Sequence, residues 1–221
     1  MTQAALEPAN VAGQPLDRYF HICAFFDSRD QEYAVLGSYY REGLASNEKA
    51  LHIVAPEVRS EHRERLGAMG IDVACCEGKG QLQVVTPAET YLVDGKFDPD
   101  KMLVNVEKIL EEARAQGYRR TRIMGNMSWA LQGAPGSERL IEYETRVNEV
   151  LSRMGQPAIC VYDATRLTGG MMLDILRSHP LTLVNGVVHE NPFFTPAEQF
   201  LSELRQRQLR AAPKRPELTL V

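Results

Sequence analysis

The chain has 221 residues, which is enough for one α/β domain with a substantial core but few for two. Hydrophobic residues make up 44% and charged residues 24%, which excludes an intrinsically disordered chain, and no apolar run approaches the roughly 18–20 residues that span a bilayer. The net charge of −4 argues against a nucleic-acid-binding surface over the whole domain. Residues 1–14 lack the basic and then apolar pattern of a secretory signal, so we expect a cytoplasmic protein whose four cysteines stay reduced.

The N-terminal part of the chain changes character near residue 18. Residues 1–17 are small, polar and proline-containing, and we expect them to be disordered. Residues 20–26 are nearly all apolar, which predicts a short strand buried on both faces of a parallel sheet. Apolar residues then recur at helical spacing from Tyr33 to Leu44, so a helix follows this strand.

Strands and helices alternate along the rest of the chain. Further strands are predicted at 50–54, 71–74, 82–85, 121–125, 157–163 and 181–188, the last as a strand or a hairpin. Helices are predicted at 57–69, 98–117, 137–154, 170–178 and 195–207, with Asp98 and Ser137 as N-caps. This alternation predicts crossover connections and a mostly parallel sheet covered by helices. Ligands bind such sheets beyond the carboxyl ends of the strands, which selects the turns at 26–32, 86–97, 125–129 and 162–170.

The turn after the first strand, Phe26 to Glu32, has neither glycine nor lysine. A phosphate-binding loop needs glycines so that backbone N–H groups can surround the phosphate oxygens, and a lysine to pair with them. The carboxylates of Asp27, Asp30 and Glu32 would also repel a polyphosphate. The turn is therefore either a capped helix start or the rim of a pocket for a ligand without phosphates, and no enzymatic activity is expected.

A second turn carries the only tryptophan of the chain. It reads Gly125-Asn126-Met127-Ser128-Trp129 and directly follows a predicted strand. A glycine at the end of a strand allows another group to approach the backbone closely. Trp129 is either a lid over the core or an aromatic wall of a small-ligand pocket.

Glu144 interrupts the apolar face of a predicted helix. Val147 and Leu151 lie near it on that face, so the carboxylate is expected to be buried and to need a partner. An arginine from elsewhere in the chain, such as Arg122 or Arg166, is one possible partner. Glu144 is therefore either a member of a structural ion pair or a residue of the site.

The histidines and cysteines form no local metal-binding motif. His21 opens the first strand, at the end opposite the expected pocket, and is interpreted as a packed, hydrogen-bonded histidine. His179 ends a helix, where a positive charge is favoured, and Cys23 is interpreted as a core residue rather than a redox switch. No H-x-x-x-H, H-E-x-x-H or C-x-x-C pattern occurs, so we expect no bound metal and no other cofactor. No G-x-S-x-G pattern occurs either, so we expect no catalytic serine.

The C-terminal region is basic, and residues 209–221 are expected to form a flexible tail. The basic residues of this region are Arg205, Arg207, Arg210, Lys214 and Arg215. Solvated charges are the simplest interpretation, and a contact with a partner or a nucleic acid is the alternative. Because the chain has no helix-turn-helix signal, direct nucleic-acid binding is not expected.

Several short motifs follow one another in order along the chain. They are HICAFF at 21–26, YL at 91–92 with GKFD at 95–98, GNMSW at 125–129, EYE at 142–144, YD at 162–163 and HP at 179–180. Together they resemble the MEDS domain, the methanogen/methylotroph, DcmR sensory domain. The resemblance runs from about Tyr19 to Arg207, which is nearly the whole chain.

This resemblance implies a three-layer fold similar to that of the KaiC and RecA ATPases, with the phosphate loop lost. Members of the family are thought to sense small molecules, and hydrocarbon derivatives are suggested for the dichloromethane-responsive repressor. They are commonly fused to DNA-binding, histidine-kinase or anti-sigma-type ATPase domains. Asn126 stands where an acidic residue is more usual in the family, which weakens any catalytic role at this position.

We therefore expect a sensory or regulatory module over residues 18–208 that has no output domain attached and signals through a protein partner or a homo-oligomer, away from membranes. The residues expected to line its small, organic ligand are Phe26, Glu32, Tyr91, Asn126, Trp129, Tyr162 and Asp163, with Glu144 nearby. Binding is expected to shift the loop at 86–97 and so change a protein interface. A nucleotide-binding or nucleotide-hydrolysing enzyme with a non-standard site, and an oligomeric scaffold without a ligand, stay open as alternatives.

Overall fold

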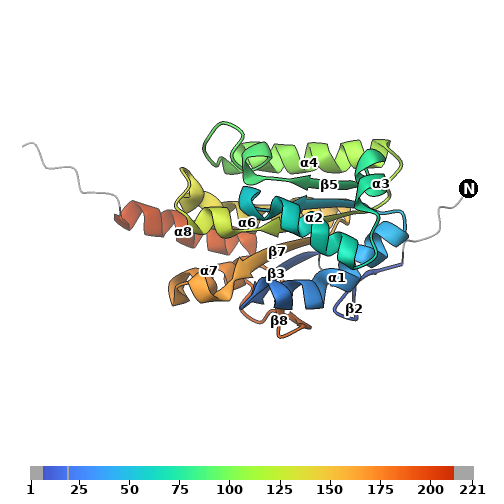
Figure 1. The fold of residues 1–221 in the computed structure, drawn as a ribbon. Helices are drawn as coiled ribbons and strands as arrows, with labels where there is room; N and C mark the ends of the chain where they lie inside the picture. The colour runs from blue at the N-terminus through green and yellow to red at the C-terminus, as the bar shows by residue number, and fades with distance from the viewer. Residues whose placement is uncertain (1–6, 19, 212–221) are drawn as a thin grey trace, which may run out of the picture.

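A computed structural model of the chain describes residues 7–18 and 20–211. Its centre is a seven-stranded sheet in the order β5-β4-β6-β7-β3-β8-β9 (Figure 1). The strands are β3 (His21–Phe26), β4 (Lys49–Ile53), β5 (Leu82–Val85), β6 (Thr121–Asn126), β7 (Ala158–Asp163), β8 (Leu181–Val184) and β9 (Val187–Glu190). All neighbours pair in parallel except β8 and β9, which form an antiparallel hairpin, so the predicted mostly parallel sheet is confirmed.

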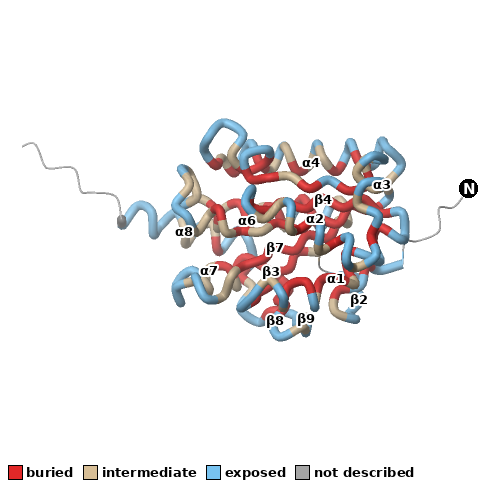
Figure 2. The backbone as a smooth tube through the Cα atoms, in the orientation of Figure 1, coloured by how far each residue is buried: buried red, intermediate tan, exposed pale blue. Residues whose placement is uncertain are grey.

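Helices cover both faces of this sheet and make three layers. They are α1 (Arg29–Ala45), α2 (Arg59–Ala68), α3 (Val73–Gly78), α4 (Pro99–Ala115), α5 (Ser128–Leu131), α6 (Leu140–Met154), α7 (Gly169–Ser178) and α8 (Ala197–Ala211). One core cluster joins α1, α2 and α3 to the sheet, and a second joins α4, α6 and α7 to the opposite face. Figure 2 shows burial concentrated along the strands and exposure along the outer helices and loops. In the described ranges, no helix is both long and apolar enough to cross a membrane.

Successive side chains of β3 point to opposite faces, as the pleat of a strand requires. Ile22, Ala24 and Phe26 belong to the cluster beneath α1, whereas Cys23 and Phe25 belong to the cluster beneath α6. The same alternation along β7 places Ile159 and Val161 on the α1 side and Cys160 and Tyr162 on the α6 side. This alternation decides which side chains of one strand can take part in one site.

Local capping chemistry explains where the sequence predictions hold and where they fail. Asp98 caps α4 as expected, accepting hydrogen bonds from the backbone N–H groups of the first turn. The cap predicted at Ser137 is wrong, because this residue opens a short 3-10 helix before α6 and makes no capping bond. The strand predicted at 71–74 is also wrong, because the carboxylate of Asp72 accepts a hydrogen bond from the N–H of Cys75 and caps the helix α3.

The N-terminal segment is ordered where the structure describes it. Strands β1 (Ala9–Val11) and β2 (Gln14–Leu16) form a hairpin, and its two turn residues both have positive φ, as a tight type I′ turn requires. The hairpin buries Ala9, Val11 and Leu16 against the core beneath α1. The predicted disorder of residues 1–17 is therefore wrong for 7–17, while 1–6 lie outside the described residues.

The C-terminal helix α8 runs past the expected boundary at residue 208. Arg207 pairs with Asp174 of α7, so this part of the basic region is a packed helix. Residues 212–221, with Lys214 and Arg215, lie outside the described residues.

Candidate functional site

A pocket of about 240 Å³ lies at the carboxyl edge of the sheet, where β3, β6 and β7 end. We call it the carboxyl-edge pocket. It lies at the edge at which parallel α/β sheets bind ligands. Its apolar lining consists of Phe26, Val54, Ala55, Val58 and Val161.

Most of the residues predicted to bind a ligand line this pocket. They are Phe26, Glu32, Asn126, Tyr162 and Asp163. Three of them are the last residues of their strands, so strand ends that are far apart in sequence meet at one place. Arg29, His62 and Arg166 also line this pocket, although the sequence pattern did not predict them as lining residues. Arg29 and Arg166 lie in turns that it did select, whereas His62 carries no comparable signal.

The turn between β3 and α1 is a capped helix start that also forms the pocket rim. The Ser28 hydroxyl accepts a hydrogen bond from the N–H of Gln31, and the Gln31 side chain in turn accepts one from the N–H of Asp27. Side chains thus occupy backbone N–H groups that a phosphate loop would turn towards its ligand. The same residues therefore form both the capped start of α1 and part of the pocket rim.

Glu32 brings a carboxyl group into the buried wall of the pocket, with only 5% of its surface exposed. Burial raises its pKa to about 7, and the positive charges of Arg29 and Arg65 oppose that shift. The carboxyl group therefore changes between a hydrogen-bond donor and an anion near neutral pH. That change gives the pocket a titratable polar contact.

Tyr33 and His62 connect the pocket to a hydrogen-bonded chain in the interior. The Tyr33 hydroxyl is hydrogen-bonded to Nδ1 of His62, and Nε2 of His62 lies 2.8 Å from Nδ1 of His52. Burial lowers the pKa of His62 to about 3 and that of His52 well below its usual range, so both rings are neutral. Arg29 donates a hydrogen bond to the Tyr33 hydroxyl at 3.1 Å, which fixes this wall of the pocket.

Tyr91 and Trp129 do not line the carboxyl-edge pocket. Their rings stack on each other, 4.9 Å apart, and they pack with Phe97 and Tyr143 in the core beneath α4 and α6. Trp129 is 4% exposed. The structure therefore favours the interpretation of Trp129 as a lid over the core.

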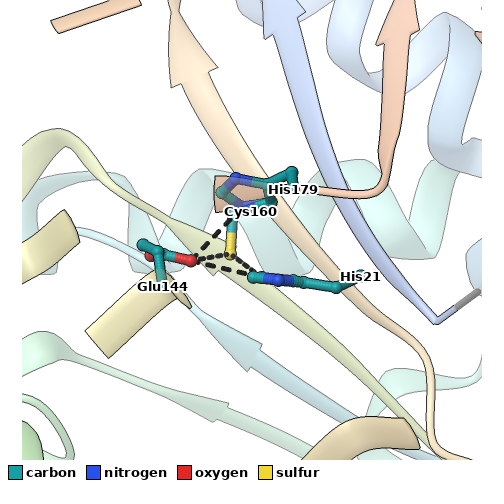
Figure 3. A group of neighbouring side chains, drawn as sticks. All are labelled: His21, Glu144, Cys160 and His179. Atoms are coloured by element: carbon teal, nitrogen blue, oxygen red, sulfur yellow. Dashed lines mark hydrogen bonds and ion pairs between the residues drawn. The ribbon is translucent and has the colours of Figure 1, made fainter. Parts of the chain in front are cut away.

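Glu144 lies in a separate, fully buried cluster between α6 and the sheet (Figure 3). Its Oε2 atom lies 3.2 Å from Nε2 of His21, 3.3 Å from Nε2 of His179 and 3.4 Å from Sγ of Cys160. Its partners are thus histidines and a cysteine, and not Arg166, which lines the pocket, or Arg122, which pairs with Glu48.

The electrostatics of this cluster are set by burial and by the two histidines. Burial alone would raise the pKa of Glu144, but the contacts of its carboxylate with the imidazole rings of His179 and His21 lower it to about 2. Burial lowers the pKa of His21 and raises that of the Cys160 thiol well above its usual range. His21 is thus buried and hydrogen-bonded as expected, and Cys23 packs in the core, where its thiol donates to the carbonyl oxygen of Leu181.

His21, Glu144, Cys160 and His179 offer ligand atoms that all lie within 4.8 Å of one another. They come from β3, α6, β7 and the connection between α7 and β8, so no spacing pattern in the sequence reveals the group. Histidine, carboxylate and thiolate groups are the ligands that divalent transition metals take in proteins. The prediction that no metal is bound considered only motifs of residues close together in the sequence. The structure brings these four residues together from distant parts of the chain.

Residues 20–180 match the family model for MEDS, the methanogen/methylotroph, DcmR sensory domain. The chain belongs to the MEDS family. A relative, the transcriptional repressor DcmR of Methylorubrum extorquens (strain DSM 6343 / CIP 106787 / DM4), is 26% identical over 170 residues. The match covers 76% of this chain but 61% of the repressor, so the chain spans less than two thirds of that relative. The family and this relative support a sensory or regulatory role for the MEDS chain.

A solved structure supports the fold assignment of the MEDS chain. A KaiC-like protein from the hyperthermophilic archaeon Pyrococcus horikoshii OT3 superposes with a TM-score of 0.52 at 13% identity, covering 74% of this chain and 69% of that protein. The predicted RecA/KaiC-like fold is thus confirmed. The first turn of this MEDS chain departs from a phosphate loop in its residues, having no glycine and no lysine between Phe26 and Glu32.

Proposed function

We propose that this MEDS chain is a sensory module that binds a small organic ligand in the carboxyl-edge pocket and passes the binding event to a protein partner. The observation that carries the proposal is the pocket itself. It lies at the strand ends where this class of fold binds ligands, and the turn from Phe26 to Glu32 on its rim lacks the glycines and the lysine of a phosphate-binding loop.

The lining favours a small, uncharged ligand with one or two polar groups. About 240 Å³ is less than the roughly 300–1,000 Å³ of pockets for drug-sized compounds. Phe26, Val54 and Val161 supply apolar contact, while Glu32 and Asn126 supply polar contact. The carboxylates of Asp27, Glu57 and Asp163, which also line the pocket, disfavour polyphosphates, so nucleotide hydrolysis is not part of the proposed function.

One wall of the pocket offers a route from ligand to surface. Glu57 and Val58 of that wall directly precede Arg59, whose guanidinium pairs with Glu89 at 3.3 Å. Glu89 belongs to the loop at 86–97, where its carboxylate accepts hydrogen bonds from the N–H and hydroxyl of Thr86. A ligand that displaces Val58 would therefore move an exposed loop, and a changed loop surface is a signal that a partner protein can recognise.

Thermal melting against a panel of small organic compounds and Mg²⁺–ATP tests this function. The Val58→Phe variant narrows the pocket, and Val104→Phe, on the exposed face of α4, adds the same side chain elsewhere. We expect at least one organic compound to raise the melting temperature of the wild type and of Val104→Phe, with a rise that saturates as the concentration of the compound increases. The melting temperature of Val58→Phe should not rise. If Mg²⁺–ATP stabilises the chain and is hydrolysed, the enzyme alternative is favoured. If Val58→Phe binds the organic compound as tightly as the wild type does, the ligand site lies elsewhere.

A further inference from the structure

We propose that His21, Glu144, Cys160 and His179 together bind one divalent transition-metal ion, of the Zn²⁺ or Fe²⁺ class, in a buried tetrahedral site. This site is separate from the carboxyl-edge pocket, which none of the four residues lines. Figure 3 shows the four side chains converging on one point from four different segments.

The spacing of the four ligand atoms fits such an ion. Metal–nitrogen and metal–oxygen bonds of about 2.0–2.2 Å and a metal–sulfur bond of about 2.3 Å place tetrahedral ligand atoms about 3.3–3.6 Å apart. Nε2 of His21 lies 3.2 Å from the Glu144 oxygen and 3.4 Å from the Cys160 sulfur. The same oxygen lies 3.3 Å from Nε2 of His179 and 3.4 Å from the Cys160 sulfur. All four ligand atoms lie within 4.8 Å of one another, so the atoms that are furthest apart must move closer together to bind one ion.

Hydrogen bonds to Nδ1 of each ring orient both histidines as metal ligands. The Asn148 amide nitrogen donates to the carbonyl oxygens of Glu144, Thr145 and Ser178, so its Oδ1 atom is left to accept the Nδ1 proton of His21. His179 donates its own Nδ1 proton to the carbonyl oxygen of Ile175 at 2.8 Å. When each ring binds as a neutral ligand, its Nε2 lone pair then faces the cluster, which is the arrangement found in metal-binding histidines.

Hydrogen bonds within the protein leave this cluster unsatisfied. With both Nε2 atoms presenting lone pairs, the thiol of Cys160 is the one remaining donor among the four groups. Nε2 of His179 and Oε1 of Glu144 are buried atoms with no hydrogen-bond partner in the described chain. A buried polar atom without a partner costs free energy, and a cation that accepts the Nε2 lone pair of His179 and offsets the charge of the Glu144 carboxylate reduces that cost.

The charges and donor types select the class of ion. A thiolate and a carboxylate supply two negative charges, which one divalent ion balances, so the occupied site is neutral inside the core. Two nitrogens, one sulfur and one oxygen suit ions such as Zn²⁺, Fe²⁺ or Co²⁺, whereas Mg²⁺ and Ca²⁺ prefer oxygen ligands alone. Bound there, the ion would join β3, β7, α6 and the end of α7, and so stabilise the fold.

Reconstitution of the full chain with Co²⁺ tests the proposal, because a thiolate ligand gives a charge-transfer band and four-coordinate Co²⁺ gives intense visible bands. After metal removal and refolding, we expect one tightly held Co²⁺ per chain with both features, displaced by Zn²⁺. Cys160→Ser should lose the charge-transfer band. Cys23→Ser is the matched control, because Cys23 is also fully buried on the same face of the sheet, and it should keep the band.

X-ray absorption of the metal-loaded wild type covers the case in which Cys160→Ser fails to fold. We expect one sulfur at about 2.3 Å and nitrogen or oxygen ligands at about 2.0–2.2 Å. Three results would each overturn the proposal. The folded chain could hold no Co²⁺ or Zn²⁺ at one equivalent, the charge-transfer band could survive Cys160→Ser, or the bound metal could be surrounded only by nitrogen and oxygen.

Discussion

The Glu32→Gln substitution isolates the cost of burying an ionised carboxylate in the carboxyl-edge pocket. Glutamine keeps the size and hydrogen-bonding capacity of the side chain but cannot ionise. The folded chain holds the pKa of Glu32 at about 7, compared with 4.5 for an ordinary glutamate. Between these values the folded state binds more protons than the unfolded state, so the Glu32 contribution to the free energy of unfolding falls as the pH rises.

The size of this effect follows from the shift. Each pKa unit corresponds to about 1.4 kcal/mol, so a change from 4.5 to about 7 lowers stability by about 3 kcal/mol above the folded pKa. Between pH 5 and pH 8 the change is about 2.5 kcal/mol. Buried neutral histidines such as His52 and His62 act in the opposite direction, because their lowered pKa makes folding more favourable as the pH rises. The measurement is therefore the difference between wild type and variant, in which those contributions cancel.

Urea unfolding at both pH values measures this difference, with circular dichroism and the buried Trp129 as probes. We expect the free energy of unfolding of Glu32→Gln, relative to that of the wild type, to rise by about 2.5 kcal/mol between pH 5 and pH 8. Glu64→Gln, at an exposed position of α2, is the control and should shift by no more than about 0.5 kcal/mol. A Glu32→Gln difference that does not change with pH would refute the buried, raised-pKa carboxyl group on which the pocket chemistry rests.

Three further predictions test other parts of the structure. Ser28→Ala removes the N-cap of α1 and should lower the free energy of unfolding, measured with urea, by about 1 kcal/mol. An unchanged free energy of unfolding would mean that the cap is not formed. Glu48→Ala leaves the buried guanidinium groups of Arg120 and Arg122 without their shared carboxylate and should cost about 3–5 kcal/mol, and a loss below about 1 kcal/mol would contradict the buried ion pairs. Asn148→Ala should weaken Co²⁺ binding about 10–100-fold while keeping the thiolate band, and unchanged affinity would exclude its role in positioning His21.

The position of the pocket could be predicted from the sequence because it depends on local rules. Strands of apolar residues are visible in the sequence, and parallel strands present their carboxyl ends at one edge. Phe26, Asn126 and Asp163, each at the end of a strand, were therefore selected and do line the pocket. Glu32 was predicted as well because it lies in the first turn of the next helix, on the same side.

The face on which a side chain lies was harder to predict. Tyr91 and Trp129 follow strand ends too, but packing between α4 and α6 turns their rings into the core. No sequence pattern near either residue distinguishes a pocket wall from a core lid. The ordered N-terminal hairpin was missed for a related reason, because within residues 7–17 only Ala9, Val11 and Leu16 are buried.

The buried cluster around Glu144 could not be predicted from spacing at all. His21 and Cys160 are far apart in sequence, and the pairing of β3 with β7 alone brings them within 3.4 Å. The sequence did show that a carboxylate interrupts the apolar face of α6. It could not show which partner compensates that charge, because the choice is made by tertiary packing.

Hydrogen–deuterium exchange tests most directly the claim that the carboxyl-edge pocket is where this MEDS chain binds its ligand. The wild-type chain would be measured with and without the organic compound that most raises its melting temperature. We expect added protection in residues 26–33 and 54–62, which contain two walls of the pocket, together with a change in the loop at 86–97. Protection confined to other segments, such as α4 or α8, would contradict the account.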